Sequence, residues 1–259
     1  MQQYALITGA SKGIGKCIAE SLAAKGFNLL LVARSEDLLK EVCRDLNSKY
    51  KITAQWLAAD LSVAGAAAKI HDWCTSNKYS IQVLVNNAGY GLSGSFEKYN
   101  AQEHTDMMHV NMDVPVSLCR LFLPQLRQQG KAFILNIGSS AAYQAVPGLS
   151  AYAASKSFIL SFSRGLRKEL KNTTVSVTCV CPGSTDTNFV NQAQIGDKAR
   201  KLADKVNMTP ERVAAISVNA LMKGKAEVIP GFINKAGALL TWLLPKSVLE
   251  NGAMKIYQP

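Results

Sequence analysis

The chain has six cysteines but lacks the spacings that would tie them to a metal ion. It contains no CxxC pair and no cluster of cysteine with histidine, which argues against a zinc site. The three histidines (His71, His104 and His109) also fit no metal spacing, so we predict no bound metal. Most of the cysteines fall at apolar positions of predicted helices and strands. We therefore expect buried free thiols and a reducing compartment.

Long apolar runs are also missing. No stretch approaches the roughly 20 apolar residues that span a bilayer. The amino terminus, MQQYALITG, has no basic region and leads straight into an expected strand, so no signal peptide is evident. These absences predict a cytoplasmic protein with no membrane span.

Acidic residues are scarce relative to basic ones. The chain has 18 Asp and Glu against 29 Lys and Arg, a formal net charge of +11, and much of the excess lies in the last third. Such a surface can simply be solvated, or it can attract nucleic acid, an anionic membrane or an anionic small molecule. No basic and aromatic motif of a nucleic-acid module is present. We therefore expect no nucleic-acid partner, and a polyanionic cofactor and substrate are the next interpretation after plain solvation.

Apolar runs bounded by turn residues alternate with segments of helical periodicity along the chain. The expected strands cover 4–8, 27–33, 52–58, 81–86, 131–138 and 174–181, with a seventh at 226–230. The expected helices cover 14–25, 36–49, 62–77, 102–128, 150–171 and 209–223. Each strand is apolar on both faces or nearly so, as a sheet covered by helices on both faces requires. The pattern predicts an α/β fold, a Rossmann-type doubly wound parallel sheet of six to seven strands, in one domain over 1–259.

A glycine-rich turn, Gly9-Ala10-Ser11-Lys12-Gly13-Ile14-Gly15, follows the first expected strand and opens a helix. Glycine permits a sharp turn with positive φ and lets backbone amides approach a phosphate. The helix then presents free N–H groups and the positive end of its dipole. The spacing is GxxxGxG rather than GxGxxG. Its place at the first strand–helix junction predicts a site for the pyrophosphate of a dinucleotide.

The second expected strand ends in Val32-Ala33-Arg34-Ser35, without the carboxylate that takes the ribose hydroxyls of NAD. A carboxylate would repel a 2′-phosphate, whereas the guanidinium of Arg34 can bind it through a planar fork. Lys12 could reach the same phosphate. Either residue alone could be ordinary surface charge, but the two together favour NADP(H).

Tyr152 and Lys156 lie four residues apart at the start of the predicted helix 150–171, so they share one face. Ser139 lies thirteen residues before the tyrosine, where the fifth strand ends, and Ser140 beside it is an alternative. Ligands of doubly wound sheets bind beyond the carboxyl ends of the strands. These three side chains are therefore candidates for one site.

The order and spacing of these motifs resemble the short-chain dehydrogenase/reductase family over nearly the whole chain. Further matches are Asp60, Asn86-Asn87-Ala88-Gly89, Asn111 and Pro182-Gly183. The resemblance implies that Tyr152 gives its proton to a substrate carbonyl oxygen as hydride arrives from the nicotinamide, while Ser139 hydrogen-bonds that oxygen. It also implies that Lys156 favours the phenolate and holds the nicotinamide ribose, and that Asn111 anchors a water for proton relay.

The same resemblance implies a set of cofactor contacts. Asp60 would contact the adenine with Leu61 nearby, Asn87 would lie along the ribose, and Thr185 and Thr187 are similar to the family's carboxamide and phosphate contacts. The full set is Gly9, Ser11, Lys12, Gly13, Ile14, Gly15, Arg34, Ser35, Asp60, Leu61, Asn87, Ala88, Gly89, Tyr152, Lys156, Pro182, Gly183, Thr185 and Thr187.

The chain departs from many family members after about residue 230, because it lacks the Asp-Gly-Gly tail that completes the sheet and builds a tetramer. Apolar residues at 232/233, 236, 239/240 and 243/244 instead form a helical stripe that stops at Pro245. Three interpretations stay open for this stripe. It could pack on its own domain or a sister subunit, form a substrate lid, or lie at a membrane interface.

These features predict an NADPH-dependent enzyme that interconverts a ketone or aldehyde and an alcohol, with Tyr152 as general acid and base. The substrate is expected to be an apolar carbonyl compound (acyl, steroid-like or xenobiotic), and the enzyme a homodimer or homotetramer. The altered tail argues against the 3-oxoacyl reductase of fatty-acid synthesis. The alternative is a dinucleotide-binding regulator or membrane-associated binding protein with little turnover, which the presence of both Tyr152 and Lys156 disfavours.

Overall fold

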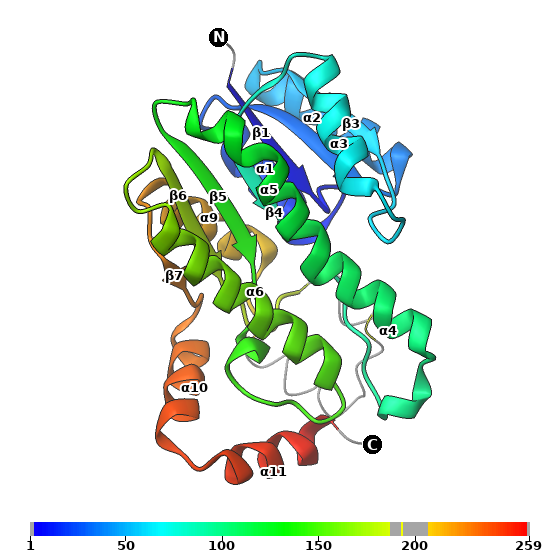
Figure 1. The fold of residues 1–259 in the computed structure, drawn as a ribbon, viewed down its shortest axis with the longest axis vertical. Helices are drawn as coiled ribbons and strands as arrows, with labels where there is room; N and C mark the ends of the chain where they lie inside the picture. The colour runs from blue at the N-terminus through cyan, green and yellow to red at the C-terminus, as the bar shows by residue number, and fades with distance from the viewer. Residues whose placement is uncertain (1–2, 187–192, 194–206, 258–259) are drawn as a thin grey trace.

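A single parallel sheet forms the centre of the computed structural model, which describes residues 3–186, 193 and 207–257 (Figure 1). Its seven strands run in the order β3-β2-β1-β4-β5-β6-β7, as a doubly wound topology requires. The strands are β1 (Gln3–Thr8), β2 (Asn28–Ala33), β3 (Ala54–Ala58), β4 (Ser80–Asn86), β5 (Ala132–Ile137), β6 (Val175–Val180) and β7 (Glu227–Val228). The predicted fold class and the predicted seventh strand are confirmed.

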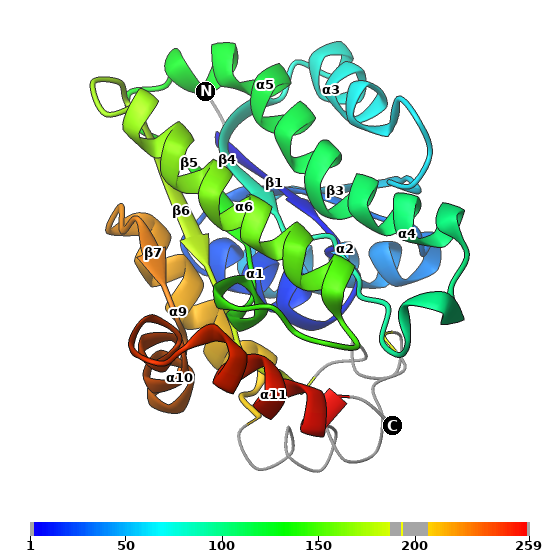
Figure 2. The same ribbon diagram turned by 60° about the horizontal axis from the view of Figure 1, so that its bottom comes forward.

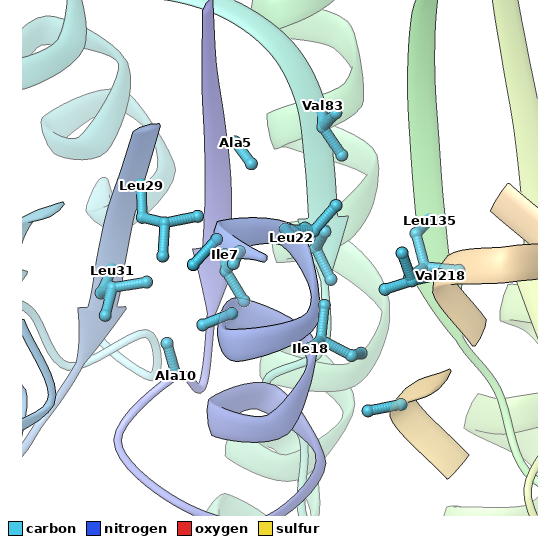
Figure 3. Packing of buried hydrophobic residues seen from close by; sticks show 14 of the residues in the cluster. Ala5, Ile7, Ala10, Ile18, Leu22, Leu29, Leu31, Val83, Leu135 and Val218 are labelled. Atoms are coloured by element: carbon cyan, nitrogen blue, oxygen red, sulfur yellow. The ribbon is translucent and has the colours of Figure 1, made fainter. Parts of the chain in front are cut away.

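Helices cover both faces of the sheet because its strands alternate apolar side chains to each side. Ala5 and Ile7 of β1 pack under α1 (Gly13–Ala23), beside α2 (Glu36–Tyr50) and α9 (Pro210–Met222). Figure 3 shows Ile18 and Leu22 of α1 pointing into this layer. Tyr4 and Leu6 of β1 belong to the opposite layer, which is formed with α3, α5 and α6. These three are α3 (Ala66–Ser76), α5 (Val114–Arg127) and α6 (Ser150–Glu169).

Two predicted elements begin later than expected, and each has a local cause. The strand expected from residue 52 starts at Ala54, because Lys51 ends α2 in the left-handed conformation with φ 53°. The helix expected from residue 62 starts at Ala66, after Gly65 with φ 81°. A positive φ interrupts regular structure, and glycine adopts it without steric cost.

The single helix predicted over 102–128 is interrupted. It consists of α4 (Ala101–Met108), a π-helical turn η2 (His109–Asp113) and α5. A π turn inserts one extra residue into a helix without changing its apolar periodicity much, and such turns are frequent at functional sites. Asn111 lies in this turn and is buried. The described residues also include two short 3-10 segments, η1 (Phe96–Lys98) and η3 (Ser140–Tyr143).

The end of the chain forms α10 (Phe232–Leu243) and α11 (Lys246–Tyr257), of which only the first was predicted. Both lie below the lower end of the sheet, outside the two helical layers (Figure 1). The predicted apolar stripe of α10 is largely exposed, with Phe232, Leu239 and Leu243 all in contact with solvent. The interpretation that this stripe packs on its own domain is therefore wrong. None of the helices in the described part of the chain has the length and apolarity to cross a bilayer.

Candidate functional site

Helix α6 carries both Tyr152 and Lys156, and buried polar side chains fix it against the sheet. The Asn86 amide donates to Asn136 Oδ1 at 2.8 Å across β4 and β5. The Asn136 amide in turn donates to Ser163 Oγ of α6 at 2.9 Å. Apolar packing alone leaves a helix some freedom to slide, whereas directional hydrogen bonds between buried side chains favour one position. This network sets the register of α6 relative to the ends of the strands.

The Lys156 ammonium is enclosed between the ends of the strands. The side chain is 6% exposed, and Nζ donates to the Ile137 carbonyl at 3.0 Å. Nζ also lies 5.8 Å from the centroid of the Tyr152 ring. Burial disfavours the charged form and lowers the pKa of Lys156 to about 8, although the nearby thiols of Cys179 and Cys181 oppose this shift. The site thus holds a cation that can exchange its proton near neutral pH.

Tyr152 lies against an apolar cluster on the other side. Its side chain is 8% exposed and packs with Met107, Val146 and Leu149. Ala253 of α11 belongs to the same cluster, so the unpredicted C-terminal helix contributes to this part of the molecule. Figure 2 shows α11 running below the start of α6. An apolar wall beside a phenol suits a ligand with an apolar body and one polar atom.

Asn111 is held in the π turn by three hydrogen bonds. Its amide donates to the Tyr90 carbonyl and to Ser155 Oγ, both at 3.0 Å, and its oxygen accepts from the Tyr90 N–H at 3.1 Å. The Ser155 hydroxyl donates to the Tyr152 carbonyl at 2.7 Å. Ser155 therefore connects Asn111 to the helix turn that carries the tyrosine and the lysine. Sequence reasoning missed this serine, although its place directly before Lys156 was a signal.

The close approach of Asn111 and Lys156 is visible at Gly89. A Cβ at Gly89 would lie 2.8 Å from Asn111 Oδ1 and 3.3 Å from Lys156 Nζ. Only glycine leaves that space open. The structure thus brings Gly89, Asn111 and the Tyr152 and Lys156 pair of α6 together, from three separate segments of the chain.

Ser139 lies just beyond β5, two residues after the carbonyl that Lys156 contacts, and its side chain is buried. Its Oγ accepts from the Ala141 N–H at 3.1 Å and so caps η3. The alternative residue, Ser140, begins η3 and is half-buried. Ser139 therefore combines a local capping role with a place at the carboxyl end of the sheet.

The glycine turn has the geometry expected of an anion site. Gly9 and Gly13 have φ of 67° and 57°, conformations that favour glycine. No described side chain caps α1 at Lys12, and its first turn contains no acid. The first N–H groups of the helix are therefore available to an anion. A Cβ at Gly15 would collide with the Gly9 carbonyl, so this glycine is needed for the tight turn.

Side chains from β1 and β4 brace this turn. The Asn87 amide donates to the carbonyls of Thr8 and Gly9 at 2.9 and 3.1 Å. Thr8 Oγ1 accepts from the N–H groups of Asn87 and Ala88, both at 3.1 Å. Thr8 was not among the predicted site residues, although it stands directly before the glycine turn. Through these hydrogen bonds the Thr8 hydroxyl connects the end of β1 to the end of β4, where the dinucleotide is expected to bind.

The predicted 2′-phosphate residues lie on the surface. Arg34 and Ser35 follow β2, Lys12 directly precedes α1, and all three are exposed. The backbone N–H and hydroxyl of Ser62 lower the pKa of Asp60, and the positive charge of Arg34 adds to this effect. Asp60 is thus an anion near Arg34, while the neighbouring Leu61 is buried.

The loop after β6 adjoins the C-terminal extension. Pro182 and Thr185 are buried, and Thr185 Oγ1 donates to the Gly183 carbonyl at 3.2 Å. A Cβ at Gly183 would collide with the side chain of Asn234, so α10 lies directly against this loop. The predicted site residue Thr187 lies outside the described residues.

The comparisons with known proteins agree with this geometry. A family model described as short chain dehydrogenase matches residues 3–198. Very-long-chain 3-oxoacyl-CoA reductase-A of Danio rerio is 33% identical over 261 residues, which covers 98% of this chain and 78% of that protein. NADP-dependent 3-hydroxy acid dehydrogenase of Schizosaccharomyces pombe is 32% identical over 231 residues, which covers 86% of this chain and 88% of that protein.

Solved structures agree as well. A short-chain dehydrogenase from Sphingobium yanoikuyae in complex with NADPH is 28% identical and superposes with a TM-score of 0.82, covering 98% of this chain and 96% of that one. That structure holds NADPH, and the Schizosaccharomyces pombe relative is named for its dependence on NADP. Together with the family match over residues 3–198, these likenesses show that the chain belongs to the short-chain dehydrogenase/reductase family of oxidoreductases.

Proposed function

We propose that this protein is an NADPH-dependent oxidoreductase that interconverts a carbonyl group and an alcohol, with Tyr152 as general acid and base. The observation that carries the proposal is the buried ammonium of Lys156, which lies 5.8 Å from the centroid of the Tyr152 ring. The chain that holds this pair belongs to a family of oxidoreductases. An ammonium in a poorly solvated site favours the ionised form of a nearby phenol. In the proposed mechanism this effect lets Tyr152 exchange its proton with a substrate oxygen.

The residues of the glycine turn fit a dinucleotide. The uncapped start of α1 offers backbone N–H groups to the pyrophosphate, and Gly9, Ser11, Lys12, Gly13, Ile14 and Gly15 would surround it. Asn87, Ala88 and Gly89 after β4, with Pro182, Gly183 and Thr185 after β6, would lie along the ribose and nicotinamide. Thr187 stays a cofactor contact expected from the sequence alone. Asp60 and Leu61 would border the adenine.

The preference for NADPH over NADH rests on Arg34, with Lys12 and Ser35. The guanidinium of Arg34 is exposed where a 2′-phosphate would approach, and the end of β2 carries no acid to repel it. The NADPH in the Sphingobium yanoikuyae structure and the NADP-dependent 3-hydroxy acid dehydrogenase of Schizosaccharomyces pombe support this preference.

Each site residue has its own role in the proposed reduction of the carbonyl group. When bound, NADPH supplies the hydride. Tyr152 donates its hydroxyl proton to the substrate oxygen, and Ser139 hydrogen-bonds the same oxygen and stabilises its developing charge. Lys156 favours the phenolate and would hold the ribose, while Asn111, fixed by Tyr90 and Ser155, would anchor a water that returns protons to the lysine.

The substrate is proposed to be a ketone with an apolar body. The cluster around Tyr152 contains Met107, Val146, Leu149 and Ala253, with Leu92 packed against it. Such side chains gain free energy by covering apolar surface but offer no partner to a charged group. The relation to a very-long-chain 3-oxoacyl-CoA reductase supports an acyl ketone as the first compound to test.

The test is the variant Tyr152→Phe, which keeps the ring and removes the acid. We expect kcat for reduction of a ketone panel, followed by NADPH absorbance, to fall about 100-fold or more. NADPH binding, followed by its fluorescence, should stay nearly unchanged. Tyr50→Phe is the matched control, because Tyr50 bonds Glu20 on another part of the surface and should keep full activity.

Normal turnover by Tyr152→Phe would refute the catalytic assignment. If the unaltered protein binds NADPH but reduces no ketone, the alternative of a dinucleotide-binding regulator with little turnover gains support. The homodimer or homotetramer and the cytoplasmic location stay predictions.

A further inference from the structure

Helix α10 turns its apolar side away from the protein. The exposed fractions reach 84% for Phe232, 80% for Trp242 and 70% for Leu243. At 100° per residue these side chains fall on one broad arc of the helix. The linker and α11 add further exposed apolar side chains, and those of the whole segment are Phe232, Ile233, Leu239, Leu240, Trp242, Leu243, Leu244, Val248 and Met254. We call this set the outer apolar face.

The inner side of α10 is small or polar. The Asn234 amide donates to the Pro230 carbonyl at 2.8 Å, Ala238 is buried, and the Thr241 hydroxyl donates to the Ala238 carbonyl at 2.7 Å. A surface helix of a globular protein ordinarily has the opposite arrangement, with large apolar residues inside and polar residues outside. Because the polarity of α10 is inverted and the described part of the chain leaves its outer apolar face exposed, this face indicates an apolar partner.

Exposed lysines lie in the same segment as this face. Between Phe232 and Tyr257 the chain has three basic residues, Lys235, Lys246 and Lys255, all exposed, and one acidic residue, Glu250. The whole protein carries a formal net charge of +11. The partner that complements the segment is therefore both apolar and anionic.

We propose that the α10–α11 segment docks flat on an anionic lipid surface. The outer apolar face would enter the boundary between headgroups and acyl chains, with Trp242 at the level of the headgroups, and the lysines would contact the anionic lipids. Twelve residues in α10 and twelve in α11 are too few for either helix to span a bilayer. A second copy of this chain is disfavoured as the partner, because it would bring the same lysines and another net charge of +11 to the interface.

Vesicle binding tests the proposal on the full-length protein. We expect co-sedimentation with vesicles of phosphatidylcholine containing 30% phosphatidylserine, and much weaker binding to phosphatidylcholine alone. The triple variant Leu239→Gln/Trp242→Gln/Leu243→Gln should bind at least tenfold more weakly. Lys235→Gln and Lys246→Gln should each weaken binding about fivefold. Salt at 1 M should also weaken binding, because it screens the attraction between the lysines and the anionic lipids.

Matched controls separate docking from folding. Val63→Gln removes an exposed apolar side chain that is far in sequence from the α10–α11 segment. Lys171→Gln removes an exposed lysine beyond the end of α6. Both should bind vesicles like the unaltered protein. All variants change exposed side chains, so their thermal unfolding should match that of the unaltered protein.

A second readout follows the indole itself. The fluorescence emission of Trp242 should shift to shorter wavelength on addition of anionic vesicles, and this shift should vanish in Trp242→Phe. Equal sedimentation with and without vesicles would overturn the proposal. A dimer in solution that the triple variant converts to a monomer, without vesicle binding, would overturn it as well and assign the face to a second copy.

Discussion

The buried ammonium of Lys156 should make the stability of the protein depend on pH in a way that one substitution removes. Burial lowers the pKa of Lys156 from 10.5 to about 8 in the folded protein. Between these two values the unfolded chain binds more protons than the folded one, so the free energy of unfolding rises with pH. Below pH 8 the lysine is charged in both states, and the folded state bears the full cost of its burial.

The magnitude follows from the two pKa values. Between pH 7 and pH 10 the lysine should raise the free energy of unfolding by about 2.5 kcal/mol, most of it above pH 8. Other titrating groups contribute too, but Lys156→Met shares nearly all of them. The difference in free energy of unfolding between the unaltered protein and Lys156→Met should therefore change by this amount across the range.

Urea unfolding at several pH values between 7 and 10 measures that difference. Lys171→Met serves as the control, because Lys171 is exposed beyond the end of α6 and its removal should give a difference that hardly varies with pH. If the difference for Lys156→Met is equally flat, the ammonium is not desolvated, and the argument for its effect on Tyr152 loses its basis.

Three further predictions concern the site. Arg34→Asp should shift the ratio of kcat/KM for NADPH and NADH toward NADH by at least about tenfold, because a carboxylate repels the 2′-phosphate, and an unchanged ratio would remove Arg34 from the phosphate site. Gly89→Ala places a methyl group 2.8 Å from Asn111 Oδ1 and should cost about 1–3 kcal/mol of stability in urea unfolding, whereas Gly165→Ala in α6, with open space around it, should not destabilise. Ser155→Ala removes one partner of the Asn111 amide and should lower kcat more than it weakens NADPH binding; equal effects on both would contradict a positioning role.

The sheet could be predicted because its strands carry an unambiguous pattern. A run such as Leu29 to Val32 is buried on both faces, as expected for a short strand between two helical layers. The π turn at 109–113 could not be predicted, because one inserted residue hardly changes the apolar periodicity of the helix. Helix α11 was missed because Asn251 and Gly252 interrupt its weak pattern.

The site could be predicted only where its residues form local motifs. The spacing of Tyr152 and Lys156 places them on one helix face, and the structure has them close together. The hydrogen bonds of Asn111 to Tyr90 and Ser155 join residues 21 and 44 positions apart, and no local pattern encodes such contacts. The low pKa of Lys156 likewise depends on burial, which arises only when β4, β5 and α6 meet.

The orientation of the C-terminal helix α10 could not be predicted from its periodicity either, and this orientation affects the site. Periodicity places the apolar residues of α10 on one face, but it does not tell whether that face points inward or outward. The small residues decide this, since Ala238 and Ala253 permit close approach to the body of the protein while the large side chains stay outside. Ala253 contacts the cluster around Tyr152, and Asn234 lies against Gly183. A partner that binds the outer apolar face would therefore also fix the position of Ala253 beside the Tyr152 cluster and of Asn234 beside Gly183.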